Sequence, residues 1–140
     1  LFENIEKNLK KIIENISFYN CALSDKDESV RLKVPIRNKN YNRNNYEEYF
    51  QMGKATIHQK NIIDEFESFD IQTKKLDDFN FTNKISFIKI DVEGHEIEVI
   101  KGSEKTIKKN KPTLLVEIEE KYTQKKVNET LKYINSLEAL

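Results

Sequence analysis

The residues best suited to chemistry lie in one short segment, Asp91-Val-Glu-Gly-His-Glu96. Asp91 and Glu93 are two positions apart, so their side chains point the same way if the backbone stays extended. Gly94 permits a sharp turn and the close approach of a ligand or of another backbone. His95, one of 2 histidines, can take up or release a proton near neutral pH. These types favour acid–base chemistry, while the alternative is a capped helix start with His95 facing solvent.

A metal site is a second interpretation of the same carboxylates and imidazole. Their spacing differs from that of the zinc-binding H-E-x-x-H helix, in which two histidines share one face. Hard cations require more oxygen ligands than this stretch supplies by itself. We therefore predict no metal ion here.

The elements that must position this segment are clearest in the second half of the chain. Ile85–Val92 is almost continuously apolar and rich in β-branched residues, which is typical of a strand covered on both faces in a parallel sheet. A helix is expected next, over His95–Lys109, with Ile97, Ile100 and Ile107 on one side and Pro112 after its end. A strand over Thr113–Ile118 follows it, and then a helix marked by Val127, Leu131 and Ile134. Alternating strands and helices predict right-handed crossovers and an α/β fold with a mostly parallel sheet and flanking helices.

The first half has weaker patterns. A helix is expected first, with Asn4 as its N-cap and a buried stripe of Ile5, Leu9, Ile12, Ile13 and Ile16. A strand over Ser17–Cys21 and a strand with Val30, Leu32 and Val34 on one side should follow. We then expect a surface loop over Arg37–Asn45 and two antiparallel strands over Ala55–Ile63 and Phe69–Thr73.

Acidic residues are expected at one edge of the sheet. Ligands of open α/β sheets bind outside the carboxyl ends of the strands. The acidic residues at such ends are Glu3 before the first helix, Asp91 and Glu93 after the strongest strand, and Glu117 and Glu119 after the next. A carboxylate there can bind a ribose diol, orient an ammonium group or act as a base. We expect Glu3 and Asp91 to come from neighbouring parallel strands and to converge on one crevice.

Composition limits the partners and the setting. The 140 residues suit one domain, 1–140, and 24 basic residues balance 24 acidic ones, so charge favours neither nucleic acid nor an anionic membrane. No apolar run approaches the roughly 18 residues of a membrane span. The single Cys21 excludes an internal disulfide and a cysteine-clustered zinc site, and a reduced, cytoplasmic setting is expected. Because the chain begins at Leu1 without Met, we interpret it as an N-terminally truncated fragment.

Four segments resemble the FkbM-type methyltransferase family. The most specific is Ile88–Glu96, followed by Val99-Ile-Lys-Gly102, Pro112 and Glu117-Ile118. Weaker matches are Lys75–Phe79, which is similar to a Thr-Leu-Asp-Asp stretch with lysine in place of threonine, Cys21–Asp25, which is similar to Ala-Leu-Ser-Asp, and Phe2-Glu3, where Asn4 replaces the proline of Phe-Glu-Pro. The resemblance extends from Phe2 to about Ile118.

The resemblance implies a Rossmann-like class I methyltransferase that uses S-adenosylmethionine, commonly on a hydroxyl oxygen of a sugar, glycan or other small metabolite. Carried over, Glu3 would bind the cofactor ribose and Cys21-Ala22-Leu23 would lie against the adenine. Asp91 would lie beside the reacting methyl group, with Glu93 and His95 in the substrate pocket.

Two departures keep alternatives open. The first strand and glycine turn of the family, which bind the methionine part of the cofactor, are not found in the chain, whose 3 glycines lie elsewhere, and the last strands are also missing. A non-catalytic remnant that only binds a partner or the cofactor is therefore one alternative. A nucleotide-sugar or NAD-dependent Rossmann-like enzyme is another, and it predicts a G-x-G-x-x-G turn upstream. The acceptor and the oligomeric state are not predicted.

Overall fold

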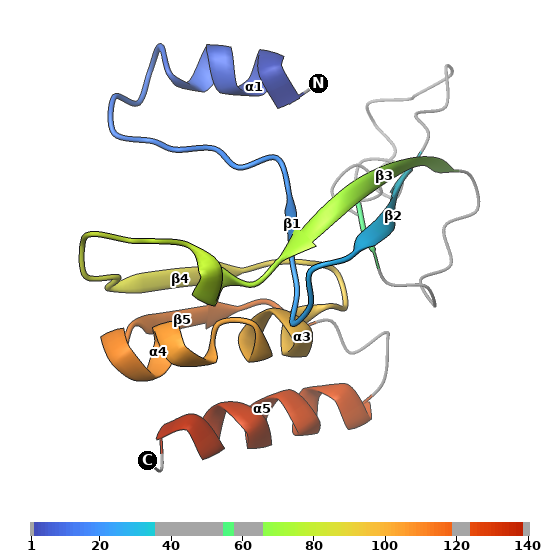
Figure 1. Ribbon diagram of the computed structural model, residues 1–140. Coiled ribbons are helices and arrows are strands. Elements are labelled where there is room, and N and C mark those ends of the chain that lie inside the picture. The colour runs from blue at the N-terminus through green and yellow to red at the C-terminus, as the bar shows by residue number, and fades with distance from the viewer. Residues whose placement is uncertain (1, 36–54, 58–65, 119–123, 139–140) are drawn as a thin grey trace, which may run out of the picture.

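The computed structural model of the chain describes residues 2–35, 55–57, 66–118 and 124–138 (Figure 1). In chain order the elements are α1 (Phe2–Leu9), β1 (Ala22–Leu23), β2 (Ser29–Pro35), β3 (Phe66–Lys74), the 3-10 helix η2 (Leu76–Asp78), β4 (Phe87–Ile90), α3 (Glu96–Lys101), α4 (Glu104–Asn110), β5 (Thr113–Val116) and α5 (Gln124–Glu138). The predicted α/β class is therefore confirmed.

The described strands form two small sheets. One has the order β1-β3-β2, in which β1 is parallel to β3 and β2 is antiparallel to it from Ser29↔Gln72 to Pro35↔Phe66. The other pairs β4 with β5 in parallel, from Phe87↔Thr113 to Ile90↔Val116. The parallel crossover expected in the second half is present, but within the described ranges a single, mostly parallel sheet is not formed.

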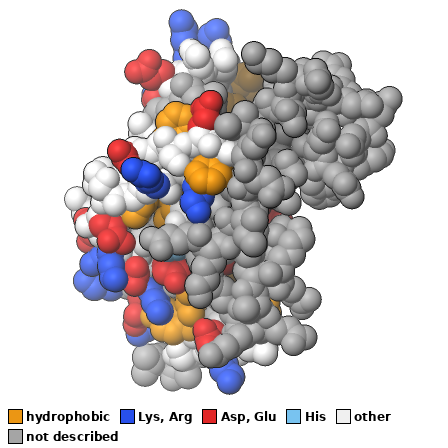
Figure 2. All heavy atoms as spheres, turned by 90° about the vertical axis from the view of Figure 1, so that its right-hand side faces the viewer, with side chains coloured by type: hydrophobic (Ala, Val, Ile, Leu, Met, Phe, Trp, Pro, Cys, Tyr) orange, Lys and Arg blue, Asp and Glu red, His pale blue; other side chains and the backbone are white. Residues whose placement is uncertain are grey.

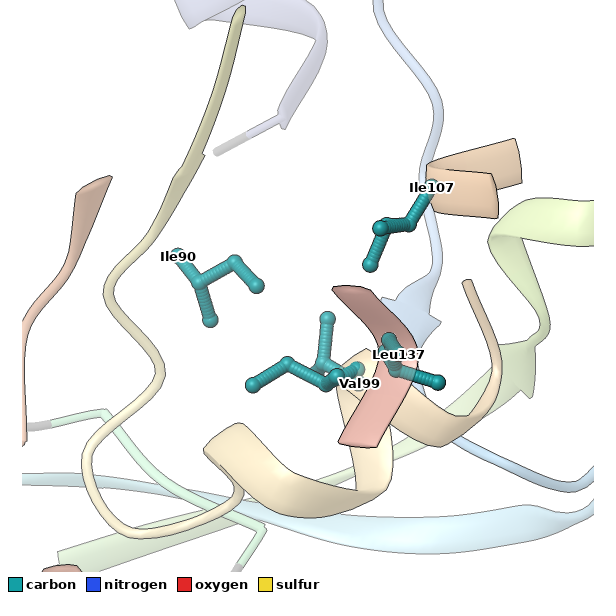
Figure 3. Close-up of a cluster of buried hydrophobic side chains, with 5 residues drawn as sticks. Ile90, Val99, Ile107 and Leu137 are labelled. Atoms are coloured by element: carbon teal, nitrogen blue, oxygen red, sulfur yellow. The ribbon is translucent and has the colours of Figure 1, made fainter. Parts of the chain in front are cut away.

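The core lies between β4 and the helices. Figure 3 shows Ile90, Val99, Ile107 and Leu137 directed toward one another, and each is at most 8% exposed. In Figure 1, α3 and α4 cover one face of the β4–β5 pair and α5 lies beneath these helices. Apolar side chains recurring along α3, α4 and α5 therefore bury one stripe of each helix.

β4 differs from the expected strand covered on both faces. Ile88 and Ile90 turn toward the helices, whereas Phe87 is 54% exposed and Lys89 is also exposed. Among the described elements, helices cover only one face of β4. Because successive side chains of a strand point to opposite faces, only every second residue of this apolar run is covered by helices.

The single helix expected over residues 95–109 is two helices, α3 and α4, that meet at Gly102 and Ser103. The hydroxyl of Ser103 donates to the carbonyl of Val99 at 2.6 Å, which closes the last turn of α3. The carboxylate of Asp77 accepts the N–H groups of Lys105 at 3.0 Å and Thr106 at 2.8 Å. The second helix thus begins with two of its free amides satisfied by a residue from η2.

The N-terminal helix is shorter than expected. α1 ends at Leu9, Asn4 lies within it rather than at its cap, and Ile12 and Ile13 are 79% and 45% exposed. Because Ile12 and Ile13 remain exposed, further helical turns there would bury little apolar surface, and a short helix gains little stability without such burial. The strand expected over Ser17–Cys21 is also wrong, because strand structure begins at Ala22.

The antiparallel pairing described in the first half joins β2 to β3. β2 contains Val30, Leu32 and Val34 and confirms that strand, and β3 includes Phe69–Thr73. Only residues 55–57 of the expected Ala55–Ile63 strand are described, where Thr56 pairs with Lys33 of β2, so the expected pairing of residues 58–63 lies outside the described residues. The Arg37–Asn45 loop lies outside the described residues. No helix in the described ranges is long and apolar enough to cross a bilayer.

Candidate functional site

Asp91 is the first residue after β4. Its side chain is 40% exposed, and Oδ2 accepts a hydrogen bond from Lys89 Nζ at 2.7 Å. Lys89 and Asp91 lie two positions apart on the exposed side, away from buried Ile90. The hydrogen bond to Asp91 and its negative charge raise the pKa of Lys89. The end of β4 therefore presents a solvent-accessible ion pair.

The chain turns into α3 through two residues with left-handed backbone angles. Glu93 has φ of 50° and Gly94 has φ of 97°. The Gly94 N–H donates to Glu96 Oε1 at 2.7 Å, and Glu96 is only 4% exposed. Thr56 Oγ1 donates to the Glu93 carbonyl at 3.0 Å. A left-handed conformation is costly for glutamate, so these contacts hold the turn in a shape that local preference does not favour.

His95 follows the turn and is largely enclosed, with 17% of its side chain exposed. Its Nε2 lies 2.9 Å from Ser24 Oγ, which is hydrogen-bonding distance. Its Nδ1 lies 3.6 Å from Glu98 Oε2, one helical turn further on. Both ring nitrogens therefore face groups of the protein, and His95 does not simply face solvent.

The contact with Ser24 joins the turns that follow β1 and β4. Ser24 comes directly after Leu23 of β1, is 3% exposed, and donates its N–H to the Lys74 carbonyl at 2.9 Å. A cleft of about 340 Å³ lies beside this junction and is lined by Leu23, Ile88, Ile90 and other mostly apolar residues. The structure thus brings the predicted Cys21–Leu23 segment and the Asp91–His95 segment to one region.

Cys21, another predicted cofactor-contacting residue, lies directly before β1. It is partly buried, and burial raises the pKa of its thiol, while the positive charge of Lys74 acts in the opposite direction. The cysteine is therefore a weakly ionised side chain beside the start of β1.

Glu3 does not join the other acidic residues. It lies in the first turn of α1 and is exposed, so it is not at the carboxyl end of a strand. Figure 1 shows α1 set apart from β4 and β5, at the opposite side of the molecule from α5. The crevice that we expected Glu3 and Asp91 to share is therefore not formed by the described residues, because Phe2 and Glu3 adopt a helix in place of a strand end.

The third acidic position is only partly described. Glu117 follows β5, is exposed, and donates its N–H to the Ile90 carbonyl at 2.9 Å, while Glu119 lies outside the described residues. The negative charge of Glu117 also contributes to the raised pKa of Lys89. The ends of β4 and β5 therefore carry Asp91 and Glu117 at the same sheet edge, as the parallel pairing requires.

The described residues contain no group of three or more His, Cys, Asp or Glu side chains arranged to hold a metal ion. On the described part of the face in Figure 2, Lys and Arg side chains alternate with Asp and Glu, so no single-sign area stands out there.

Sequence reasoning missed Ser24 and Glu98, and it considered Glu96 only as a candidate metal ligand. Ser24 lay within the Ala-Leu-Ser-Asp match and Glu96 within the most specific block, so their segments were identified without their roles. Glu98 carried the spacing signal, because residues three apart on a helix are neighbours and His95 precedes it by three.

Comparison with known proteins gives one match. A family model described as the methyltransferase FkbM domain matches residues 1–139. Curated proteins and solved structures give no match.

Proposed function

The chain belongs to the FkbM methyltransferase domain family, and from this premise we propose that it transfers a methyl group from S-adenosylmethionine to a hydroxyl oxygen. The acceptor class that we propose is a sugar, a glycan or another small metabolite. The family match over residues 1–139 is the observation that carries the proposal. The equal numbers of basic and acidic residues, 24 each, give no reason to invoke a nucleic acid acceptor.

Methyl transfer from a sulfonium is an in-line displacement in which the cofactor supplies an electrophilic methyl group. The protein must hold the acceptor oxygen in line with that group, and such positioning can contribute roughly 7–11 kcal/mol. Removal of the hydroxyl proton by a base contributes on the order of 10²–10⁴-fold.

We assign the base role to Asp91. Its side chain is accessible, and the ion pair with Lys89 uses Oδ2, so an acceptor hydroxyl would approach the other carboxylate oxygen. Both nitrogens of His95 face Ser24 and Glu98, which makes the imidazole a poorer candidate for direct proton transfer. Glu93 and His95 then shape the substrate side of the turn. The proposed fold around this site is Rossmann-like.

The residues fit one side of the cofactor. Leu23 lines an apolar cleft beside the Asp91–His95 turn, which suits contact with an adenine ring, and Cys21 and Ala22 precede it. Asp91 offers a carboxylate near the same junction. Glu3, to which the family resemblance gives the ribose, does not fit, since it lies on α1 away from this region.

That separation of Glu3 from Asp91 favours a second candidate, a methyltransferase-like module that binds a partner without catalysis. Such a module would keep the Asp91–Glu96 turn as a structural feature and would have no need of a complete cofactor site. The two candidates differ in one measurable property, which is affinity for the cofactor and its product.

Isothermal calorimetry with S-adenosylmethionine and S-adenosylhomocysteine tests the choice. We expect both to bind to the protein, and absence of heat for both would favour the non-catalytic module. With binding established, release of S-adenosylhomocysteine is measured across a panel of sugars for Asp91→Asn. Asp70→Asn, an exposed carboxylate of β3, serves as the matched control. Unchanged turnover in folded Asp91→Asn would remove Asp91 from the base role.

A further inference from the structure

We propose that Ser24 and Glu98 are positioning residues that hold the imidazole of His95 as its Nδ1–H tautomer. His95 would then connect the turn after β1 to the turn after β4. Only the consequence for methyl transfer rests on the proposed function; the arrangement of the three side chains stands independently.

Glu98 faces one nitrogen of the His95 ring. Its Oε2 is buried and, among the described residues, makes no hydrogen bond of ordinary length. This oxygen lies 3.6 Å from His95 Nδ1. A buried carboxylate oxygen is costly without a donor or positive partial charge nearby, so it favours a proton on the nitrogen that faces it.

Ser24 faces the other nitrogen of the His95 ring. With the proton on Nδ1, Nε2 is an acceptor, and Ser24 Oγ at 2.9 Å can donate to it. Asp25 Oδ1 is the other acceptor near this hydroxyl, at 3.4 Å, and the shorter distance favours the histidine. One tautomer thus satisfies the contacts with Ser24 and Glu98 together.

A serine, a histidine and an acidic residue in this order also occur in nucleophilic catalysis, where the serine oxygen attacks the substrate. That role does not suit Ser24, because the residue is 3% exposed and a substrate cannot reach its hydroxyl. The Gly102 N–H beside it is already bonded to the Glu98 carbonyl at 2.9 Å, so it is not free to stabilise an oxyanion. The geometry points to positioning.

Asp91 lies in the turn that His95 holds in place. The turn from Asp91 to Gly94 is held at one end by β4 and at the other by His95, whose ring contacts Ser24. Fixing the ring therefore limits the movement of the segment that carries the proposed base. Loss of the Glu98 contact should lower turnover while leaving the affinity for S-adenosylhomocysteine nearly unchanged.

Nitrogen-15 NMR of the imidazoles tests the proposal without any cofactor or acceptor. The protein has 2 histidines, so the His58→Asn variant assigns the His95 signals. We expect wild-type His95 to show the Nδ1–H pattern and Glu98→Gln to shift it toward the Nε2–H pattern. Glu98→Asp should restore part of the original pattern, and Asp25→Asn should leave it unchanged.

The wild-type spectrum alone can overturn the proposal, even if a variant does not fold. An Nε2–H pattern in the wild type, or the same pattern in folded Glu98→Gln as in the wild type, would rule it out. A protein that keeps the expected pattern but binds neither S-adenosylmethionine nor its product would contradict the proposed function and leave the positioning role intact.

Discussion

The backbone carbonyl of Ser24 lies so close to Gly102 that any side chain at position 102 would overlap it. A Cβ built on Gly102 would also lie 2.8 Å from the Ser24 carbonyl carbon and 3.3 Å from the Asp25 Cα. These neighbours are backbone atoms, which cannot rotate away as a side chain would. Gly102 has φ of −70°, so it is required for space and not for an unusual backbone angle.

Gly102→Ala is therefore expected to destabilise the protein. Overpacking typically costs about 1–3 kcal/mol, and a backbone obstacle places this site at the upper end or beyond. The free energy of unfolding is measured by urea denaturation. Lys105→Ala, at an exposed position of α4, is the control and should change stability by no more than about 0.5 kcal/mol. Equal stabilities of the two variants would contradict the close approach.

Asp77→Ala should destabilise α4. The Asp77 carboxylate accepts hydrogen bonds from two backbone N–H groups of the first turn, those of Lys105 and Thr106. Removal of a helix cap lowers the free energy of unfolding by about 0.5–2 kcal/mol. Asp78→Ala is a matched control, because Asp78 belongs to the same 3-10 helix and is exposed. Thermal and urea unfolding measure both variants. If Asp78→Ala costs as much as Asp77→Ala, the capping role of Asp77 is wrong.

The parts of the fold that could be predicted are those encoded by local patterns. The parallel pair β4 and β5, with helices between them, follows from two short apolar runs separated by a helical period. The turn after β4 could be located because Gly94 and its acidic neighbours interrupt those patterns. These signals lie within a few residues of the structure that they specify.

The parts that could not be predicted depend on residues distant in the sequence. Ser24 and His95 are 71 positions apart, and the local sequence around either residue does not indicate its contact with the other. Ser24 also approaches Gly102 closely at the point where the 95–109 helix divides, and no helical period reveals that approach. Glu3 was placed by resemblance to a strand end, while α1 follows its local helical periodicity.

Tyr133 is expected to ionise above its ordinary range and to make stability fall at alkaline pH. Burial is the larger cause of its raised pKa, followed by the hydrogen bond that its hydroxyl donates to Glu104 Oε2 at 2.9 Å. The folded protein holds this proton more tightly than the unfolded chain does. The resulting stability is complete below pH 10.0, the ordinary pKa, and is lost as pH rises through the higher folded value.

The measurement is a spectroscopic titration of the phenol, isolated as the difference between the wild type and Tyr133→Phe. Glu104→Gln should lower the pKa of Tyr133 without returning it to 10.0, because burial persists. Glu129→Gln, on an exposed part of α5, is the control. A pKa of Tyr133 that does not move in Glu104→Gln would show that the negative charge of Glu104 contributes nothing.

Cys21 should react slowly with iodoacetamide, and removal of Lys74 should slow it further. The thiolate is the reactive form, and burial raises the pKa of Cys21, so little thiolate exists near pH 8. Lys74 opposes this effect through its positive charge, so Lys74→Ala should raise the pKa again and reduce the alkylation rate. Cys21 is the single cysteine, which lets mass spectrometry follow one site, with the unfolded protein as the reference rate.

Lys26→Ala, which removes another exposed lysine nearby in sequence, is the control, and its Cys21 should be alkylated at the wild-type rate. Faster alkylation of Lys74→Ala would mean that the lysine shields the thiol by packing and does not act through its charge.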